Sequence, residues 1–347
     1  MFQPADLNAA IIAAPMAGGP STPALCASVT NAGGLGTLAG GYRSAGALAE
    51  QIAEARRLTP GPIGVNLFVP SDSPASHDRI SDYAERLAPF AAALGVEVPE
   101  PRFGDDDGWQ EKLDLLADTR PEFVSFTFGC PEAKILDRFA QLDVHTSVTV
   151  TTVAEAEQAA AAGAASVTLQ GPGAGGHRGT FDQEALPETA PLIETLTAVV
   201  AMLDARDAPV PVIAAGGLCS PAGLDAVLFA GAQAAQLGTA FLLAEEAGTN
   251  PVHRAALRDP GFAEASLTRS FSGRWARGLQ NEWMTALDPF APAGYPEINS
   301  LTAPLRAAAV AQGNPRLASL WAGTGFREAR IASAADIIAG LLPASRR

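Results

Sequence analysis

Short apolar runs, many of them β-branched, alternate along the chain with longer alanine-rich stretches of helical periodicity. Eight of the apolar runs have the length of buried strands, and most end at a glycine or proline. We expect strands at Ile11–Met16, Leu35–Ala39, Ile63–Phe68, Phe123–Phe128, His145–Thr151, Ser166–Gln170, Val210–Ala215 and Ala235–Phe241. Helices are expected between them at Thr22–Ala32, Ala45–Arg57, Arg79–Ala93, Ala133–Gln141, Ala154–Ala162, Leu192–Asp204 and Pro221–Ala230.

This alternation predicts an α/β fold with a parallel sheet, because parallel neighbours need a crossover connection. Eight strand–helix units in residues 1–248 favour a closed (β/α)8 TIM barrel over an open doubly wound sheet, the main alternative. Residues 94–120 hold two prolines and an acidic run, and we expect a helical insertion there, after the third unit. Residues 249–347 contain three of the four tryptophans and no strand-like run, which predicts a helical extension that caps the active site.

Composition narrows the function classes. The chain has 37 acidic and 23 basic residues, a net charge of −14, which disfavours binding to nucleic acid or to an anionic membrane. No apolar run is long enough to span a bilayer, and no basic leader precedes the first apolar stretch. Cys26, Cys130 and Cys219 lack the spacing of a zinc site or a disulfide framework. We therefore expect a cytoplasmic protein without a metal, either a monomer or a homodimer.

The unusual residues gather at the C-terminal ends of the expected strands, where barrel enzymes carry their active sites. Asn66 places an amide in an apolar strand, and Gln170 ends another. Gly216–Gly217 and Gly238–Thr239 follow the last two strands, where such barrels commonly bind phosphate through backbone N–H groups. The two loops together predict a phosphate site, although either loop alone is equally consistent with a tight turn.

Gly171–Gly176 has the spacing G-x-G-x-x-G, but the following residues do not open a helix, so we reject a dinucleotide fingerprint. His177 comes next in this loop, where a near-neutral pKa suits proton transfer or anion binding. His77, His145 and His253 lie in contexts that indicate structural or solvated roles.

Six motifs follow one another along the chain: Ala-Pro-Met-Ala-Gly-Gly at 14–19, Gly-Val-Asn-Leu-Phe at 64–68, Ala-Gly-Gly-His-Arg-Gly at 174–179, Ala-Ala-Gly-Gly-Leu at 214–218, Gln-Leu-Gly-Thr-Ala-Phe at 236–241 and Ser-Gly-Arg-Trp-Ala-Arg-Gly-Leu at 272–279. Taken together and in this order, they resemble the motifs of the nitronate monooxygenases, class I branch. Outside this context the last, basic segment would be interpreted as a solvated loop.

The resemblance implies an FMN-containing barrel. The positions that it assigns to FMN are Asn66, Gln170, Gly175, Gly216, Gly217, Gln236, Leu237, Gly238 and Thr239, with Met16 and Ala17 near the isoalloxazine ring. The catalytic histidine of the family corresponds to His177, and Ser272 is expected near the flavin. The implied reaction is oxidation of an alkyl nitronate or nitroalkane by O₂ through a flavin semiquinone, which gives a carbonyl compound and nitrite.

Two alternatives remain open at this point. The core motifs are shared with NAD(P)H-dependent FMN reductases of the enoyl-acyl-carrier-protein or quinone reductase type, and a flavin-binding protein without turnover is the other possibility. The sequence also departs from class I members that carry a lysine and a second tyrosine after a Tyr-Pro pair. Here Tyr295-Pro296 is followed by Asn299 and Ala303, and Arg306 is the candidate replacement for the lysine.

Overall fold

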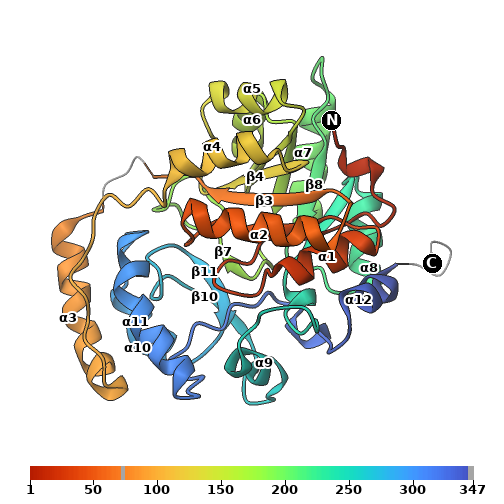
Figure 1. The fold of residues 1–347 in the computed structure, drawn as a ribbon. Coiled ribbons are helices and arrows are strands. Elements are labelled where there is room, and N and C mark those ends of the chain that lie inside the picture. The colour runs from red at the N-terminus through yellow and green to blue at the C-terminus, as the bar shows by residue number, and fades with distance from the viewer. Residues whose placement is uncertain (72–74, 343–347) are drawn as a thin grey trace.

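The computed structural model describes residues 1–71 and 75–342, and a parallel sheet with surrounding helices lies beside a second, smaller lobe (Figure 1). The strands of the sheet are β1 (Ile11–Ala13), β2 (Gly36–Ala39), β3 (Ile63–Phe68), β4 (Phe123–Thr127), β5 (His145–Val150), β6 (Ser166–Gln170), β8 (Val212–Ala215) and β9 (Ala234–Leu237). All seven pairings between them are parallel, in the order β1-β9-β8-β6-β5-β4-β3-β2.

The sheet closes between its first and last strands. A parallel bridge joins Ile12 to Leu35, where the Ala13 N–H donates to the Leu35 carbonyl at 2.9 Å and the Leu35 N–H donates to the Ile11 carbonyl at 3.0 Å. An open doubly wound sheet would leave these edges unpaired. The (β/α)8 TIM barrel predicted from the sequence is therefore confirmed.

β1 and β9 end several residues before the ends expected from the sequence, and the residues that follow each of them line a cavity. β1 stops at Ala13 because Pro15 has no N–H to continue the ladder. β9 stops at Leu237, and the chain then turns through Gly238 into a 3₁₀ turn at Thr239–Phe241. The residues after each strand consequently leave the barrel wall and face its open end.

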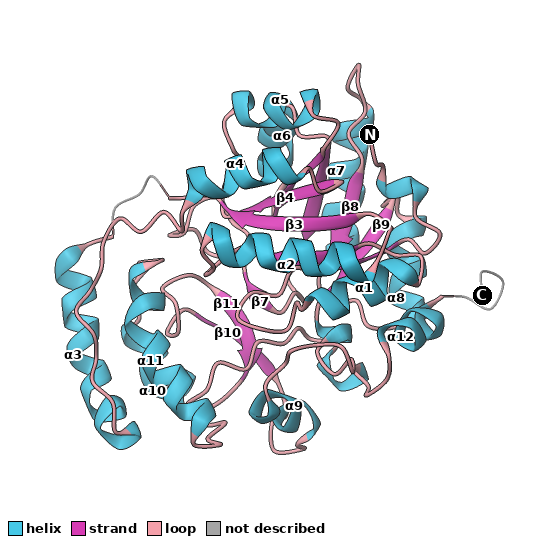
Figure 2. Ribbon diagram, in the orientation of Figure 1, coloured by secondary structure: helices cyan, strands magenta, loops and turns pink. Residues whose placement is uncertain are grey.

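Eight helices cover the outside of the barrel: α1 (Pro23–Asn31), α2 (Ala45–Leu58), α4 (Trp109–Thr119), α5 (Ala133–Gln141), α6 (Val153–Ala161), α7 (Leu192–Asp204), α8 (Pro221–Phe229) and α12 (Ala334–Leu341) (Figure 2). Side chains of Thr22, Ser44, Thr152 and Ser220 cap four of them by accepting a hydrogen bond from an N–H of the first turn. In the described part of the chain no helix combines the length and apolarity needed to cross a membrane.

Some helices do not belong to the part of the molecule in which the sequence placed them. α4 falls inside the expected insertion at 94–120, yet it contacts α2 and β3 and takes the place of the third crossover helix. The helix expected there, α3 (His77–Leu94), packs on α11 (Glu297–Ala311) of the second lobe instead. α12 comes from the expected extension but contacts α1 and α8, and its apolar face joins the barrel core.

The second lobe has its own apolar core, formed by α3 and α11 with α9 (Pro251–Arg258), α10 (Glu282–Leu287), β10 (Ala265–Thr268) and β11 (Ala276–Leu279). The expectation that residues 249–347 lack strands was wrong. β10 and β11 form an antiparallel sheet with the two-residue strand β7 (Gly176–His177) of the barrel loop. These strands escape a search for apolar runs because they are short, and much of β10 is only half-buried.

Gly36 provides a test of the packing between α1 and β2. A Cβ at this position would lie 1.9 Å from the carbonyl oxygen of Cys26, so α1 could not keep its distance from the strand. We expect Gly36→Ala to lower the free energy of unfolding by about 1–3 kcal/mol, the usual cost of overpacking. Gly46→Ala is the matched control, because a Cβ there has open space. Equal urea midpoints for the two variants would contradict this packing.

Candidate active site

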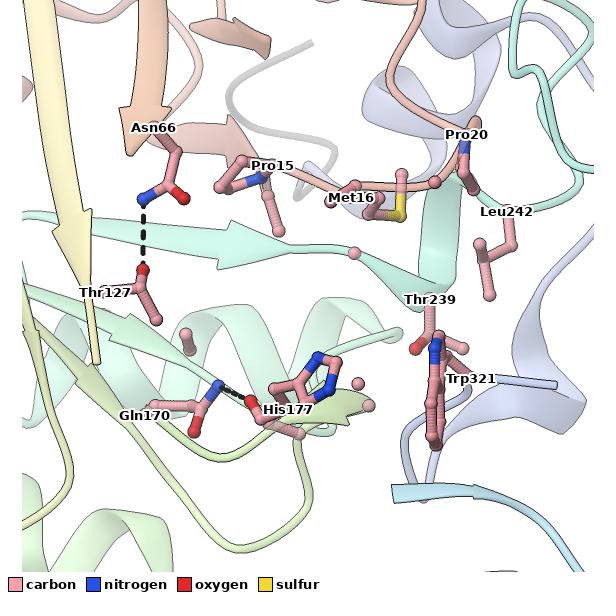
Figure 3. A pocket seen from close by; sticks show the side chains of 18 of the residues that line it. Pro15, Met16, Pro20, Asn66, Thr127, Gln170, His177, Thr239, Leu242 and Trp321 are labelled. Carbon is pink, nitrogen blue, oxygen red and sulfur yellow. Dashed lines mark hydrogen bonds between the residues drawn. The ribbon is translucent and has the colours of Figure 1, made fainter. Parts of the chain in front are cut away.

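A cavity of about 450 Å³ opens at the C-terminal ends of the barrel strands, between the barrel and the second lobe (Figure 3). Its lining includes every position that the sequence assigned to a cofactor, together with the expected catalytic histidine. These residues are Met16, Ala17, Asn66, Gln170, Gly175, His177, Gly216, Gly217, Gln236, Leu237, Gly238 and Thr239. Ser272 lies outside the lining but contacts it through His177.

One end of the cavity is a glycine cradle. Gly216 and Gly217 have φ values of +113° and +73°, which glycine adopts without strain. A Cβ at Gly175 would lie 2.4 Å from the backbone nitrogen of Gly323, so two loops approach there as closely as glycine allows. Among the described residues, the backbone N–H groups of Gly175, Gly217 and Thr239 have no hydrogen-bond partner. Unpaired N–H groups on glycine loops are the donors that proteins offer to phosphate.

The side chain of Thr239 completes this cradle. Its Oγ1 accepts a hydrogen bond from the Gly323 N–H at 2.9 Å, which leaves the hydroxyl proton available to a ligand. The segment around Gly323 comes from the second lobe, where the Thr324 N–H also donates to the carbonyl of Gly173 at 3.0 Å. Both the barrel and the lobe therefore contribute to the cradle.

Two amides stand at the opposite end of the cavity. The Nδ2 of Asn66 donates to Ser125 and Thr127 at 2.9–3.1 Å, and Figure 3 shows the Asn66 oxygen turned away from Thr127. The Nε2 of Gln170 donates to the carbonyl of His177 at 2.9 Å, and its Oε1 accepts from the Gly179 N–H at 3.0 Å. Gln170 thus holds the histidine loop in place as well as lining the cavity.

His177 is the only titratable residue among the sequence-predicted positions of the lining, and its ring is held by a serine. The Nε2 of His177 lies 2.8 Å from the Oγ of Ser272, whose hydroxyl also reaches the carbonyl of Arg274 at 3.2 Å. When the serine proton goes to that carbonyl, Oγ accepts from Nε2–H and the lone pair remains on Nδ1. Nδ1 has no hydrogen-bond partner in the described structure.

Aromatic rings and two cations surround the imidazole. The rings of Phe128, Tyr295 and Trp321 have centroids 5.5–5.9 Å from that of His177. Phe128 has a strained φ of +80° and lies under the guanidinium of Arg274, 4.2 Å from ring centroid to Cζ. The pKa of His177 is lowered from 6.5 to about 3, chiefly by burial and also by the positive charges of Arg274 and Arg306. The imidazole is therefore neutral at physiological pH.

The candidate replacement for the missing lysine does reach the cavity. Arg306 lines it together with Asn299 and Ala303, and the Nε and Nη2 of Arg306 donate to Thr302 and Asn299 at 2.8–3.1 Å. No carboxylate forms an ion pair with Arg306 in the described part of the chain. An unneutralised cation at the wall of a cavity is suited to binding an anion.

Sequence reasoning missed several residues of the lining, among them His253 and Tyr42. His253 was expected to be structural or solvated, but it is 5 % exposed, lines the cavity and has no partner for its Nε2. Tyr42 lines it from the loop before α2. No local signal identifies either residue, because His253 lies in an ordinary helix and Tyr42 follows two glycines in a loop.

The whole chain is similar to proteins of one family. The nitronate monooxygenase family profile matches residues 5–344. The chain belongs to the nitronate monooxygenase family. A probable nitronate monooxygenase of Bacillus subtilis is 38 % identical, with 93 % of this chain and 91 % of the relative aligned. One from Staphylococcus saprophyticus is 36 % identical, with 90 % and 88 % aligned.

Solved structures agree with this family assignment. A nitroalkane oxidase from Streptomyces ansochromogenes is 41 % identical and superimposes with a TM-score of 0.91 over 97 % of this chain and 96 % of the other. FabK from Thermotoga maritima has a TM-score of 0.73 at 22 % identity over 96 % and 92 %, a likeness that shows the fold alone.

The low pKa of His177 leads to a prediction about its protonation state. Because the pKa is lowered below 6.5, the folded protein resists protonation at His177 and loses stability as the pH falls through 6.5 towards 3. In the ligand-free protein, we expect the ring ¹⁵N signals of His177 to stay those of a neutral imidazole from pH 8 to pH 5. His177→Asn identifies these signals by their disappearance. A midpoint near 6.5 would show that the cavity does not desolvate the ring.

Proposed function

We propose that this protein is an FMN-dependent nitronate monooxygenase, which uses O₂ to convert alkyl nitronates into carbonyl compounds and nitrite. The observation that carries the proposal is a histidine held by Ser272, in one cavity with Arg306 and the glycine cradle. A nitronate is an anion, and this arrangement offers positive charge to an anion while keeping the imidazole unprotonated. The family membership supports the same reaction class.

The residues present fit FMN. The unpaired N–H groups of Gly175, Gly217 and Thr239 suit a phosphate, while Asn66 offers an amide to the polar edge of the isoalloxazine. Met16 and the neighbouring apolar side chains would contact the faces of the ring. When it is bound, FMN supplies the electron-transfer chemistry that no side chain can provide.

The protein residues bind, orient and exclude water. Arg306 attracts the nitro oxygens of the substrate, and the rings of Phe128 and Trp321, which line the cavity around His177, enclose the reacting carbon. Nδ1 of His177 accepts a hydrogen bond or a proton, since Nε2–H is directed to Ser272. The low pKa of His177 makes it a weak base, so the site favours an already ionised nitronate over a neutral nitroalkane, which must first lose a carbon-bound proton.

An anaerobic titration tests the reaction class. The purified protein should carry FMN, and its flavin absorbance should change on addition of ethyl nitronate or propionate 3-nitronate but not with NADH or NADPH. Admission of O₂ should then release nitrite.

Two outcomes would contradict the proposal. Rapid bleaching by NADH or NADPH, with no response to nitronate, would make the protein a flavin reductase. No response to any of these compounds would indicate a flavin-binding protein without turnover.

Substitution of the histidine tests its role. His177→Asn should retain FMN and lower kcat by about 100-fold or more, the usual size of a general acid–base contribution. The loss should be larger with neutral nitroethane than with ethyl nitronate, because only the former needs a base. Ser272→Ala should lower kcat less than His177→Asn, because it leaves the imidazole in place.

His77→Asn is the matched control, since His77 lies on α3, stacks on Phe103 and does not line the cavity. Turnover by His177→Asn at the rate of this control would remove His177 from the mechanism.

A further inference from the structure

Tyr42 is held in an unfavourable backbone conformation at the cavity. Its φ is +64°, in the left-handed region that bulky residues rarely adopt, and 41 % of the residue is exposed. Such an outlier persists only when its surroundings fix it, and it is concentrated at functional sites. Tyr42 lines the cavity, so the strain holds a side chain that a ligand can meet.

A carboxylate fixes this conformation from the far side of the loop. The backbone N–H of Tyr42 donates to Oδ1 of Asp107 at 3.0 Å, and Oδ2 of Asp107 forms an ion pair with Lys112 at 2.7 Å. Lys112 is 1 % exposed and belongs to α4, the helix that covers β3. A buried lysine needs such a partner, which ties Asp107 firmly to the barrel. The clamp therefore runs from the barrel helix through two residues to the backbone of Tyr42.

The phenol of Tyr42 contacts two other aromatic residues at the cavity. Its hydroxyl lies 3.4 Å from that of Tyr295, and the ring of Phe68 packs edge-on against the Tyr42 ring with centroids 5.4 Å apart. A Cβ at Gly41 would lie 2.1 Å from the Phe68 ring, so only glycine lets Phe68 pack there. Tyr295 in turn contacts the ring of His177, and Arg306 lines the same cavity. Tyr42 thus forms the wall of the cavity that lies across Tyr295 from the imidazole.

We propose that Tyr42 is a specificity-determining residue that limits the length of the substrate chain, and that Asp107 and Lys112 are the positioning residues that hold it there. This inference rests on the proposed function for the identity of the substrate. Tyr42 acts by direct contact with the alkyl chain of a substrate in the cavity. Asp107 and Lys112 touch no substrate and act only through the backbone of Tyr42.

The clamp is tested by protease access, which needs no turnover. The bond after Arg43 adjoins Tyr42, so trypsin releases residues 1–43 when the loop opens. Asp107→Ala combined with Lys112→Met removes the acceptor without leaving a buried charge, and we expect cleavage after Arg43 to rise at least 10-fold. Asp107→Asn combined with Lys112→Met differs only in keeping the acceptor and should be cleaved like the wild type. Equal cleavage of the two pairs overturns the clamp.

Selectivity tests the role of the tyrosine. For FMN-loaded protein, we expect Tyr42→Ala to shift the ratio of kcat/KM for hexyl nitronate over ethyl nitronate about 10-fold towards the longer chain. The Asp107→Ala and Lys112→Met pair should give the same shift and add nothing to it in a Tyr42→Ala background. Asp106→Ala should give no shift, because the neighbouring Asp106 carboxylate accepts from the Gly108 N–H instead. An unchanged ratio in Tyr42→Ala, or additive shifts, overturns the inference.

Failure of the proposed function is distinguishable from failure of this inference. If the protein does not oxidise nitronates, the wild type and every variant are equally inert towards them. The dependence on chain length is then measured as binding, by isothermal titration of the protein with carboxylates from propionate to octanoate. A shift towards the longer carboxylates in Tyr42→Ala supports the role of Tyr42, and an unchanged series overturns it.

Discussion

The pairing of β11 with β7 is the contact on which the site depends. β7 is only two residues long, and it places Gly176 and His177 opposite Arg277 and Ala276 of the second lobe. The Arg178 N–H extends the pairing by donating to the Trp275 carbonyl at 2.7 Å. Because the strand register is fixed, the turn before β11 brings Ser272 to the imidazole, although the two residues are 95 positions apart. The barrel supplies the histidine, and the lobe sets its orientation.

The electrostatics of the site follow from the same enclosure. Aromatic rings and the guanidinium groups of Arg274 and Arg306 remove water from His177 and penalise its protonation. The charges that make the imidazole a weak base also make the cavity attractive to an anion. A site of this kind suits a ligand that is already an anion better than one that must first lose a proton. Any anion that binds will also raise the basicity of His177 by partly neutralising the two arginines.

The sequence predicted the barrel because most buried strands end at a glycine or proline and several crossover helices begin at a capping residue. It also predicted the cavity lining, because special residues at strand ends converge in a closed parallel barrel. It could not show which of α3 and α4 packs against the barrel, since both are amphipathic helices and only their packing partners tell them apart. β10 and β11 were missed because antiparallel pairing, not an apolar run, stabilises them. Tyr42 was missed because its backbone N–H bonds to Asp107, a residue 65 positions away along the chain.

The path of the chain explains why the second lobe cannot be regarded as a removable cap. After β9 the chain leaves the barrel, forms the rest of the lobe beside α3 and then returns as α12, which completes the ring of helices between α8 and α1. On the way back it passes through Gly323 and Thr324, whose N–H groups bond to Thr239 and Gly173 at the cradle. A phosphate held there would contact N–H groups whose positions depend on both parts of the molecule. Its binding energy would therefore stabilise the docking of the lobe as well as the barrel, because a ligand stabilises whatever arrangement it requires.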